Sequence, residues 1–447
     1  MVMVCSCTVI LLLLNRCFSD PWSSWESSQS DSSAVAEESR DKKEAEIVTP
    51  SAVTLEEDGK TPVYSQVSKP ILPTAVGCNA VSPQQGRESL TDEGMAQLYD
   101  AISEKAYRVS ETAGENQLYP IERITVRGSS LTDGQVVQTL TAFSHDHPEV
   151  FWISNRYGYS TGDNRTVVQL YAVAPASECQ KLSKRVMAEA EKVLQNLPGG
   201  ANAMEKEITL YKTVIQNCQY DDEGAKDDQD WRAHSIVGAF LDGEAVCEGY
   251  SRALQLLLNQ AGVPSMVVTG TAGGAHMWNL VCIDGQWYQA DATWDDYGEE
   301  PLYRYLNLTD EMMSQDHQLY PQANQTEELK GDRVYNLPLP TCTATKANYF
   351  QAKGVSISSF EDIDPLAKAI SQASKNGEKS IQLYITEELD YDAAVKGLFL
   401  DAPYQFLNAV QQANLTADVP VDYNHCTYVE AKTCRGVVIL LSYEQES

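Results

Sequence analysis

The chain has 447 residues, enough for two or three domains, and its 43% hydrophobic content is ordinary for a globular protein. Its 63 acidic and 33 basic residues give a formal net charge of −30 at pH 7. A surface this acidic repels nucleic acids and anionic membranes, which argues against a nucleic-acid partner.

The N-terminal segment looks like a leader followed by a linker. Residues 1–18 contain an apolar run that suits an export signal, although no basic region precedes the run and no small-residue cleavage site follows it. Residues 19–86 are predicted to be a disordered linker or stalk, because their first part is rich in Ser, Glu and Asp. We therefore expect an extracellular or cell-surface protein, secreted or tethered to the membrane through the leader alone. The alternative is a wrongly assigned start codon, or a cytosolic protein with an irregular N-terminal end.

The 11 cysteines do not form an obvious disulfide framework, because several lie in the leader and the others are scattered. Cys426 and Cys434 are the one pair close enough in sequence for a local bridge. We expect most of the other cysteines to be small buried apolar residues.

The rest of the chain reads as α+β and divides into three predicted units. Residues 87–176 predict an N-terminal α+β unit that ends in a β-hairpin. Residues 177–338 predict helices followed by antiparallel strands, and residues 339–447 predict a separate α/β unit of unknown role. The predicted helices of these three units cover residues 89–110, 133–145, 177–218 with a break at 197–200, a short helix within 231–243, 247–262, 365–374, 391–398 and 404–414. The predicted strands cover residues 121–128, the hairpin within 148–173, 265–271, 276–283, 286–294, 354–360, 379–386 and 435–443.

One cysteine stands where a helix should begin. The stretch GEAVCEGYSRALQLLLNQAG (residues 243–262) has leucines at helical spacing and a glycine at its end, and Cys247 falls at its start. The unpaired N–H groups and the dipole at a helix N-terminus stabilise a thiolate and could also stabilise an oxyanion. Cys247 is therefore a candidate nucleophile.

A predicted hairpin supplies the partners of this cysteine. If Asp284 and Gly285 form a two-residue turn, Ile283 pairs with Gln286 and Trp278 lies opposite Asp291. His276 and Asp291 are then diagonal neighbours on one face of the sheet. The carboxylate would orient the imidazole, which could take the proton of the thiol.

Longer motifs around these residues resemble the transglutaminase-like superfamily, particularly its bacterial secreted members. The resemblance is carried by VCEGYSRALQLLLNQAGVPSMVVTG, HMWNLVCIDGQWYQADATWDD and YLNLTDEMMSQDH, and it covers residues 205–320. It implies a papain-like core, in which a helix with the cysteine packs on an antiparallel sheet with histidine and aspartate. By this resemblance Cys247 is the nucleophile, His276 the general base and then acid, and Asp291 the orienting group.

The oxyanion site is less well defined. Papain-type peptidases have a glutamine six residues before the cysteine, and this chain has Leu241 there. The backbone N–H of Cys247 is the first candidate donor. Tyr250, His234 and Ser235 are candidates for the second donor, and the last two could equally cap or pack a short helix.

Two tryptophans near the predicted triad also allow two readings. Trp278 and Trp294 could line a groove for the acyl donor, or they could pack in the core beside the hairpin.

We predict a thiol-dependent enzyme that acts on amide or peptide bonds through a thioester, with protein or peptide substrates that include cell-wall peptide. Whether water or an amine accepts the acyl group is left open. No cofactor is expected, and the acidic stretch YDDEGAKDDQD lacks the ligand spacing of a calcium loop.

Two other readings remain. A transglutaminase-like fold could serve as a non-catalytic surface or cell-wall binding module. Cysteine, histidine and aspartate could also bind zinc, although a helix-start cysteine and a diagonal His–Asp pair suit a triad better.

Overall fold

The computed structural model describes residues 47, 50–53, 63–81, 84–114, 117–298, 301–359 and 361–444. The predicted leader and most of the predicted linker lie outside these residues. The chain divides into two compact units with a boundary between Asn348 and Tyr349. No helix within the described ranges is long and apolar enough to cross a membrane.

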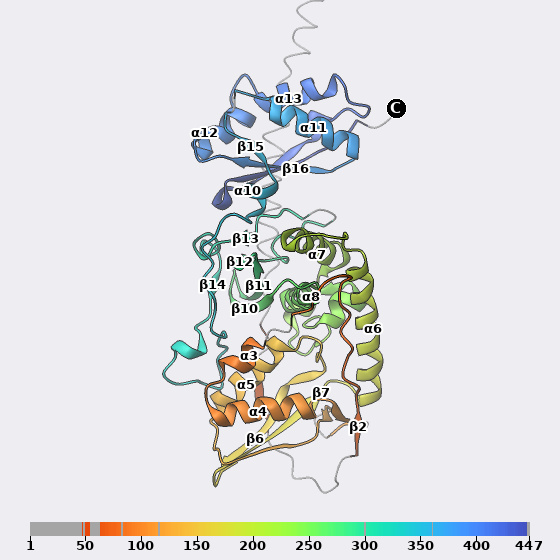
Figure 1. Cartoon of the computed structure of the whole chain (residues 1–447), viewed down its shortest axis with the longest axis vertical. Helices are drawn as coiled ribbons and strands as arrows, with labels where there is room; N and C mark the ends of the chain where they lie inside the picture. Colours follow the sequence, from red (N-terminus) through yellow and green to blue (C-terminus); the bar gives the residue numbers. More distant parts are fainter. Residues whose placement is uncertain are drawn as a thin grey trace, which may run out of the picture. The chain divides into compact units, whose positions relative to one another are not determined.

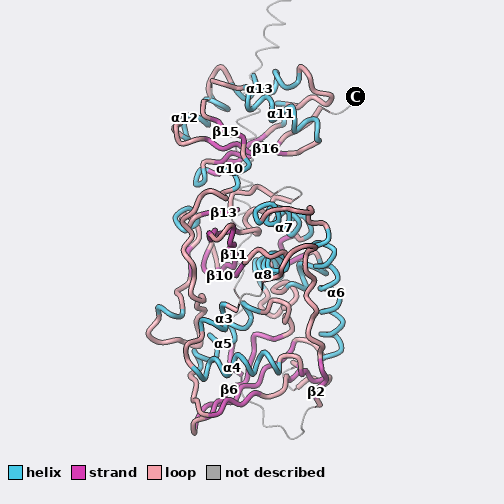
Figure 2. Tube along the Cα trace, viewed as in Figure 1, coloured by secondary structure: helices cyan, strands magenta, loops and turns pink. Residues whose placement is uncertain are grey.

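The first part of the unit before Tyr349 is a sheet with helices packed on it (Figures 1 and 2). Its strand order is β1-β6-β7-β4, and β5 also pairs with β7. The strands are β1 (Ser51–Val53), β4 (Tyr119–Pro120), β5 (Ile124–Arg127), β6 (Ile153–Gly162) and β7 (Arg165–Ala172). The helices are α3 (Gln85–Ser89), α4 (Glu93–Lys105) and α5 (Asp133–Asp146), and β2 (Tyr64–Gln66) pairs with β3 (Arg108–Ser110).

Part of the predicted disordered linker is ordered instead. Residues 51–53 add to the edge of β6 in parallel, and residues 64–66 pair with β3. Val67, directly after β2, is fully buried. Composition alone missed this because each strand is only three residues long.

The second part of the same unit contains a helix packed on an antiparallel sheet. The strand order is β13-β12-β11-β10-β14, and Figure 1 shows α8 beside these strands. The strands are β10 (Ser265–Thr271), β11 (Ala275–Ile283), β12 (Gln286–Ala290), β13 (Leu306–Leu308) and β14 (Gln318–Leu319). The other elements are α6 (Ala176–Gln195), α7 (Ala203–Asn217), α8 (Cys247–Gln260), α9 (Asp310–Met313), short 3₁₀ turns at Gly224–Lys226 and Ala323–Gln325, a π-helical turn at Gly238–Asp242, and the pair β8 (Gln219–Tyr220) and β9 (Glu244–Ala245).

The first turn of α8 is attached to β11 by two hydrogen bonds. Ser251 Oγ donates to the carbonyl oxygen of Met277 at 2.9 Å, and Asn279 Nδ2 donates to the carbonyl oxygen of Ser251 at 3.0 Å. The predicted leucine stripe of α8 is buried, including Leu254 and Leu258, and buried leucines contribute about 1.5–3 kcal/mol each. The N-terminal half of the helix, which starts with Cys247, is therefore held against the strand that contains the predicted base His276.

The β11–β12 hairpin has the predicted register, with one difference. Ile283 pairs with Gln286 and the pairing continues to Asn279 and Ala290, where it stops. The predicted strand to residue 294 is therefore too long. Asp291 leaves the ladder because its backbone N–H donates to the carbonyl oxygen of Tyr305, at 3.0 Å.

The second unit contains one four-stranded sheet with helices between its strands in the sequence. The strand order is β15-β16-β18-β17. The prediction from sequence missed β17. The elements are α10 (Tyr349–Lys353), β15 (Val355–Ile357), α11 (Asp364–Asn376), β16 (Ser380–Ile385), α12 (Tyr391–Val395), a π-helical turn (Lys396–Leu400), α13 (Gln405–Asn414), 3₁₀ turns at Tyr423–His425 and Lys432–Cys434, β17 (Thr427–Ala431) and β18 (Gly436–Leu440).

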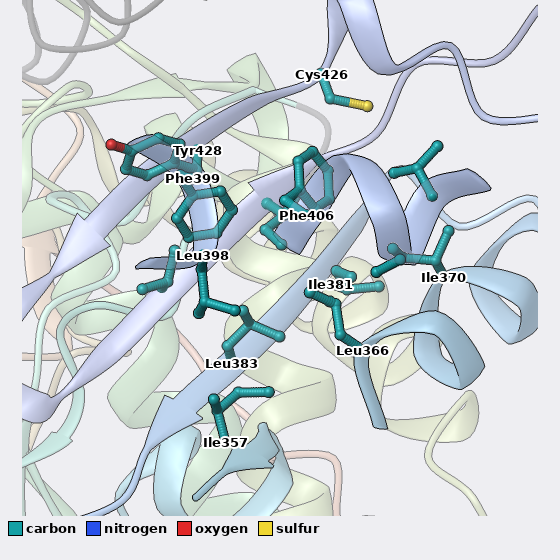
Figure 3. Close-up of a cluster of buried hydrophobic side chains, with 14 of the residues drawn as sticks. Ile357, Leu366, Ile370, Ile381, Leu383, Leu398, Phe399, Phe406, Cys426 and Tyr428 are labelled. Carbon is teal, nitrogen blue, oxygen red and sulfur yellow. The ribbon is translucent and has the colours of Figure 1, made fainter. Parts of the chain in front are cut away.

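The core of this unit lies between the helices and the sheet (Figure 3). Phe399 stacks on Tyr428 with ring centroids 4.3 Å apart. The bridge considered between Cys426 and Cys434 is not formed. The two thiols instead donate to different carbonyl oxygens, Cys426 to Asp422 and Cys434 to Ala431, each at 3.3 Å.

The turn between β11 and β12 gives the first prediction. Asp284 and Gly285 have φ of 50° and 79°, so Gly285→Ala should lower the free energy of unfolding by about 1–2 kcal/mol, through backbone strain alone. Asp284→Gly, at the neighbouring left-handed position, is the control and should be close to neutral. Urea denaturation followed by tryptophan fluorescence reports the unfolding of the unit before Tyr349, because residues 349–447 contain no tryptophan. An unchanged midpoint for Gly285→Ala would contradict the turn.

Candidate active site

Cys247 is the first residue of α8 and is fully buried. It packs in a small apolar cluster with Val246, Val267 and Met277, and Ile47 and Tyr220 pack against that cluster. Met277 directly follows His276, the predicted base, in β11. Cys247 therefore packs against the immediate neighbour of that base in the strand.

His276 and Asp291 form the predicted pair. The distance from His276 Nε2 to Asp291 Oδ2 is 2.7 Å, and both side chains are 1% exposed. A carboxylate can only accept, so the imidazole Nε2 carries the hydrogen. Nδ1 is then the ring nitrogen that can act as the base toward a thiol.

The carboxylate of Asp291 has four hydrogen-bond donors around it. Oδ1 accepts the backbone N–H groups of Thr293 and Trp294, at 2.9 and 3.2 Å. Oδ2 accepts from His276 and from His317, the latter at 3.0 Å. Burial alone would raise the pKa of Asp291, but the two imidazoles hold it well below the ordinary value. Asp291 therefore stays ionised although it is buried.

The thiol of Cys247, unlike the carboxylate of Asp291, is shifted toward its neutral form. Burial and then the carboxylate of Glu248 raise the pKa of Cys247 far above the ordinary value. Backbone N–H groups of Met277 and Glu248 act in the opposite direction but do not outweigh burial. The helix start therefore does not produce a thiolate in this conformation, and the buried cysteine is a neutral thiol.

His317 is the residue that the sequence analysis missed. Its side chain is fully buried between two carboxylates, with Nδ1 2.6 Å from Asp316 Oδ1 and Nε2 3.0 Å from Asp291 Oδ2. Burial would lower the pKa of His317, but the hydrogen bonds to Asp291 and Asp316 raise it, which favours the imidazolium form. The signal was present in YLNLTDEMMSQDH, whose last two residues are Asp316 and His317.

Comparison with known families places these residues in a known domain. Residues 191–292 match the family model of the transglutaminase-like superfamily. Residues 191–292 are thus a transglutaminase-like domain. The match includes Cys247, His276 and Asp291, whereas His317 lies after it.

Solved structures and curated proteins add little to this assignment. A crystal structure of a TGase is 17% identical, with a TM-score of 0.22, and covers 38% of this chain and 50% of its own. A protein provisionally called a protease, from Parabacteroides distasonis, is 15% identical (TM-score 0.20, 34% and 36% covered). One provisionally called a cysteine protease, from Cytophaga hutchinsonii, is 18% identical (TM-score 0.19, 30% and 55% covered). The chain thus spans about half or less of the length of these structures. No curated protein matches the chain.

The side-chain candidates for an oxyanion donor in the transglutaminase-like domain all have other partners. The hydroxyl of Tyr250 lies 2.7 Å from Asp296 Oδ2 and 2.8 Å from the carbonyl oxygen of Cys218. His234 lies with Nδ1 2.6 Å from Glu248 Oε2 and Nε2 3.3 Å from the carbonyl oxygen of Gly224. Ser235 Oγ bonds within its own turn.

Leu241, at the papain glutamine position, lies in the π-helical turn Gly238–Asp242, and its side chain has no donor. The backbone N–H of Cys247 therefore stays the first candidate for the oxyanion.

The two tryptophans pack in the core of the transglutaminase-like domain. Trp278 is 1% exposed, stacks beside His276 and donates from Nε1 to Gln289 Oε1 at 2.6 Å. Trp294 is 4% exposed and contacts His317 edge-on. The packing reading fits both residues, since neither lines an open groove.

A metal ion has one conceivable set of ligands in the described ranges. One ligand atom each from His276, Asp291 and His317 lie within 4.8 Å of one another. These atoms already pair as hydrogen-bond donors and acceptor, and the imidazolium of His317 has no lone pair for a metal. The arrangement therefore suits a hydrogen-bonded triad better than a metal site.

The position of His317 gives the second prediction. His317→Gln should lower the free energy of unfolding by about 3 kcal/mol at pH 6, because it removes a charged partner of the buried Asp291. The raised pKa of His317 means that its contribution is fully present below its unfolded pKa, about 6.5, and is lost as pH rises through the folded value. The difference between wild type and variant should therefore shrink toward pH 9.

Urea midpoints at both pH values test this, with His147→Gln as the control. His147 is only partly buried and pairs with Glu149, so its loss should cost less than about 1 kcal/mol. A difference for His317→Gln that does not change with pH would show that the ring is not charged.

Proposed function

We propose that the transglutaminase-like domain is a thiol-dependent acyl-transfer enzyme that acts on amide or peptide bonds of protein or peptide substrates. The observation that carries this proposal is the buried 2.7 Å hydrogen bond between His276 Nε2 and Asp291 Oδ2. Cys247, at the start of α8, packs in one cluster with Met277, the residue that follows His276. In this proposal Cys247 is the nucleophile, His276 the base and Asp291 the orienting group.

The first half of the reaction forms a thioester. Cys247 Sγ attacks the carbonyl carbon of the substrate while His276 Nδ1 takes the thiol proton. The carbonyl oxygen becomes an oxyanion, which the backbone N–H of Cys247 would stabilise. When the C–N bond breaks, the imidazolium returns the proton to the leaving amine and Sγ keeps the acyl group.

The second half releases the acyl group to water or to an amine. His276 removes a proton from the acceptor as it attacks the thioester, and then returns that proton to Sγ as the C–S bond breaks. Both acceptors use the same residues, so hydrolase and transferase differ only in what reaches the thioester.

The environment of Cys247 fits a base-assisted attack. Since burial keeps the sulfur as a neutral thiol, the proton must leave during the attack and must have an acceptor. The ionised Asp291 favours proton uptake by His276, because it stabilises the imidazolium that forms.

A non-catalytic binding module is the second candidate, and one observation favours it. Cys247 is fully buried, so a substrate carbonyl cannot reach the sulfur in this conformation. The enzyme proposal therefore requires that the residues covering Cys247 move aside.

A glutamine-containing peptide, incubated with and without a primary amine, tests the activity. We expect ammonia release without the amine, or incorporation of the amine, detected by mass spectrometry. Cys247→Ala and His276→Ala should each lower the rate by at least about 10³-fold, and Asp291→Asn by about 10²–10⁴-fold.

Cys179→Ala is the matched control, because Cys179 is an equally buried cysteine on α6 and is not part of the proposed triad. If Cys247→Ala and Cys179→Ala have the same activity as wild type, the enzyme proposal is wrong. An acylated Cys247 trapped with a peptide ester would identify the thioester directly.

A further inference from the structure

A cavity of about 220 Å³ lies beside the proposed active site, within the unit before Tyr349. Its wall combines the end of α5, the start of β6, the loop that precedes α8 and the first turns of α8. The side from α5 and β6 lies outside the region that matches the superfamily, so this cavity belongs to the particular architecture of this chain.

One part of the cavity wall is apolar and aromatic. Phe143, Val150 and Met277 line it, and Phe151 and Trp231 form an aromatic pair there. The rings of this pair are parallel within 7°, with centroids 6.3 Å apart, and both residues are half-buried. A further apolar or aromatic side chain could therefore pack against them and gain about 25 cal/mol per Å² of buried area.

Three ionisable side chains in the wall, His234, Glu248 and Arg252, are already engaged with one another. Glu248 lies 2.6 Å from His234 and 3.6 Å from Arg252, and Arg252 also donates to the carbonyl oxygen of Ser144 at 2.9 Å. A charged ligand would lose its hydration without gaining an uncommitted partner among these three side chains. The cavity therefore favours an uncharged apolar group.

Two neighbours of the proposed nucleophile line the cavity. Glu248 follows Cys247 in α8, and Met277 lines the cavity while it packs in the same cluster as Cys247. A group bound here would contact residues that adjoin the cysteine.

The segment that includes Ile47, Pro50 and β1 shows how an extended peptide could lie along the cavity. Ile47 lines the cavity and packs against the cluster that contains Cys247. Pro50 also lines the cavity, and β1 then pairs in parallel with the edge of β6, Ser51 with Arg156. A backbone on a sheet edge with a side chain in a pocket is a common mode of peptide recognition.

We propose that this cavity receives a large apolar side chain of an extended peptide substrate, and that in the free protein Ile47 covers part of the cavity wall next to the cluster that contains Cys247. The proposal rests on the proposed function and names the class of its substrate. An apolar cavity of about 150 Å³ binds benzene, so this volume is sufficient for the ring of phenylalanine.

Binding can be measured without turnover in full-length Cys247→Ala protein. The probes are fluorescein-labelled seven-residue peptides of alanine and glutamine with one phenylalanine, moved through the positions, and the same set with aspartate in its place. We expect the best phenylalanine peptide to bind 10- to 100-fold tighter than its aspartate counterpart by fluorescence anisotropy. Phe151→Ala should remove most of this preference, and Phe151→Tyr should retain it.

A second pair of variants tests the role of Ile47. Ile47→Asp should tighten binding of the best phenylalanine peptide at least threefold, because a charged side chain no longer packs on the apolar wall that the peptide must contact. It should also speed alkylation of Cys247 by iodoacetamide in the protein that retains the cysteine. Ile71→Asp is the matched control, since Ile71 is 91% exposed, and it should change neither quantity.

Equal affinities for the phenylalanine and aspartate peptides at every position would overturn the proposal, as would identical behaviour of Ile47→Asp and Ile71→Asp. The two proposals fail separately. If the protein prefers phenylalanine peptides but does not process glutamine peptides, the cavity proposal stands and the enzyme proposal is wrong. If the protein turns over glutamine peptides without any preference for phenylalanine, the enzyme proposal stands and the cavity is not its substrate site.

Discussion

The arrangement of the proposed active site depends on one buried negative charge. The carboxylate of Asp291 is 1% exposed, and it is stable as an anion only because two imidazoles and two backbone N–H groups donate to it. Each of these donors comes from a separate part of the chain or from the turn that follows Asp291. The hairpin, that turn and the segment that carries His317 must therefore all be in place before the charge is tolerated. In this way the carboxylate links folding of the domain to orientation of His276.

Much of this arrangement follows from short-range patterns. The two-residue turn at Asp284 and Gly285 fixes which residues pair, and the pairing brings His276 and Asp291 to one place although 15 positions separate them. The helix start at Cys247 follows from the leucine stripe and the terminal glycine. The prediction failed where the chain leaves regular structure, since Asp291 belongs to a turn rather than to β12.

The remainder depends on contacts between distant segments, which periodicity does not report. His317 meets Asp291 only because β14 pairs with β10. The cavity exists because α5 packs near α8, where Arg252 and Gln255 donate to carbonyl oxygens at the end of α5. The protonation of Cys247 depends on the tertiary structure for a related reason. The helix N-terminus is visible in the sequence, whereas the burial that outweighs it is a property of the tertiary structure.

The neutral state of the buried thiol has a consequence for the chemical lifetime of the protein. Peroxide oxidises cysteine through the thiolate, and the higher oxidation states of sulfur are irreversible in most proteins. In the proposed reaction Cys247 loses its proton only when a carbonyl is present, so the thiol would be protected from this damage until a substrate binds. Oxidising surroundings would then cost this protein less activity than they cost an enzyme with a permanently ionised cysteine.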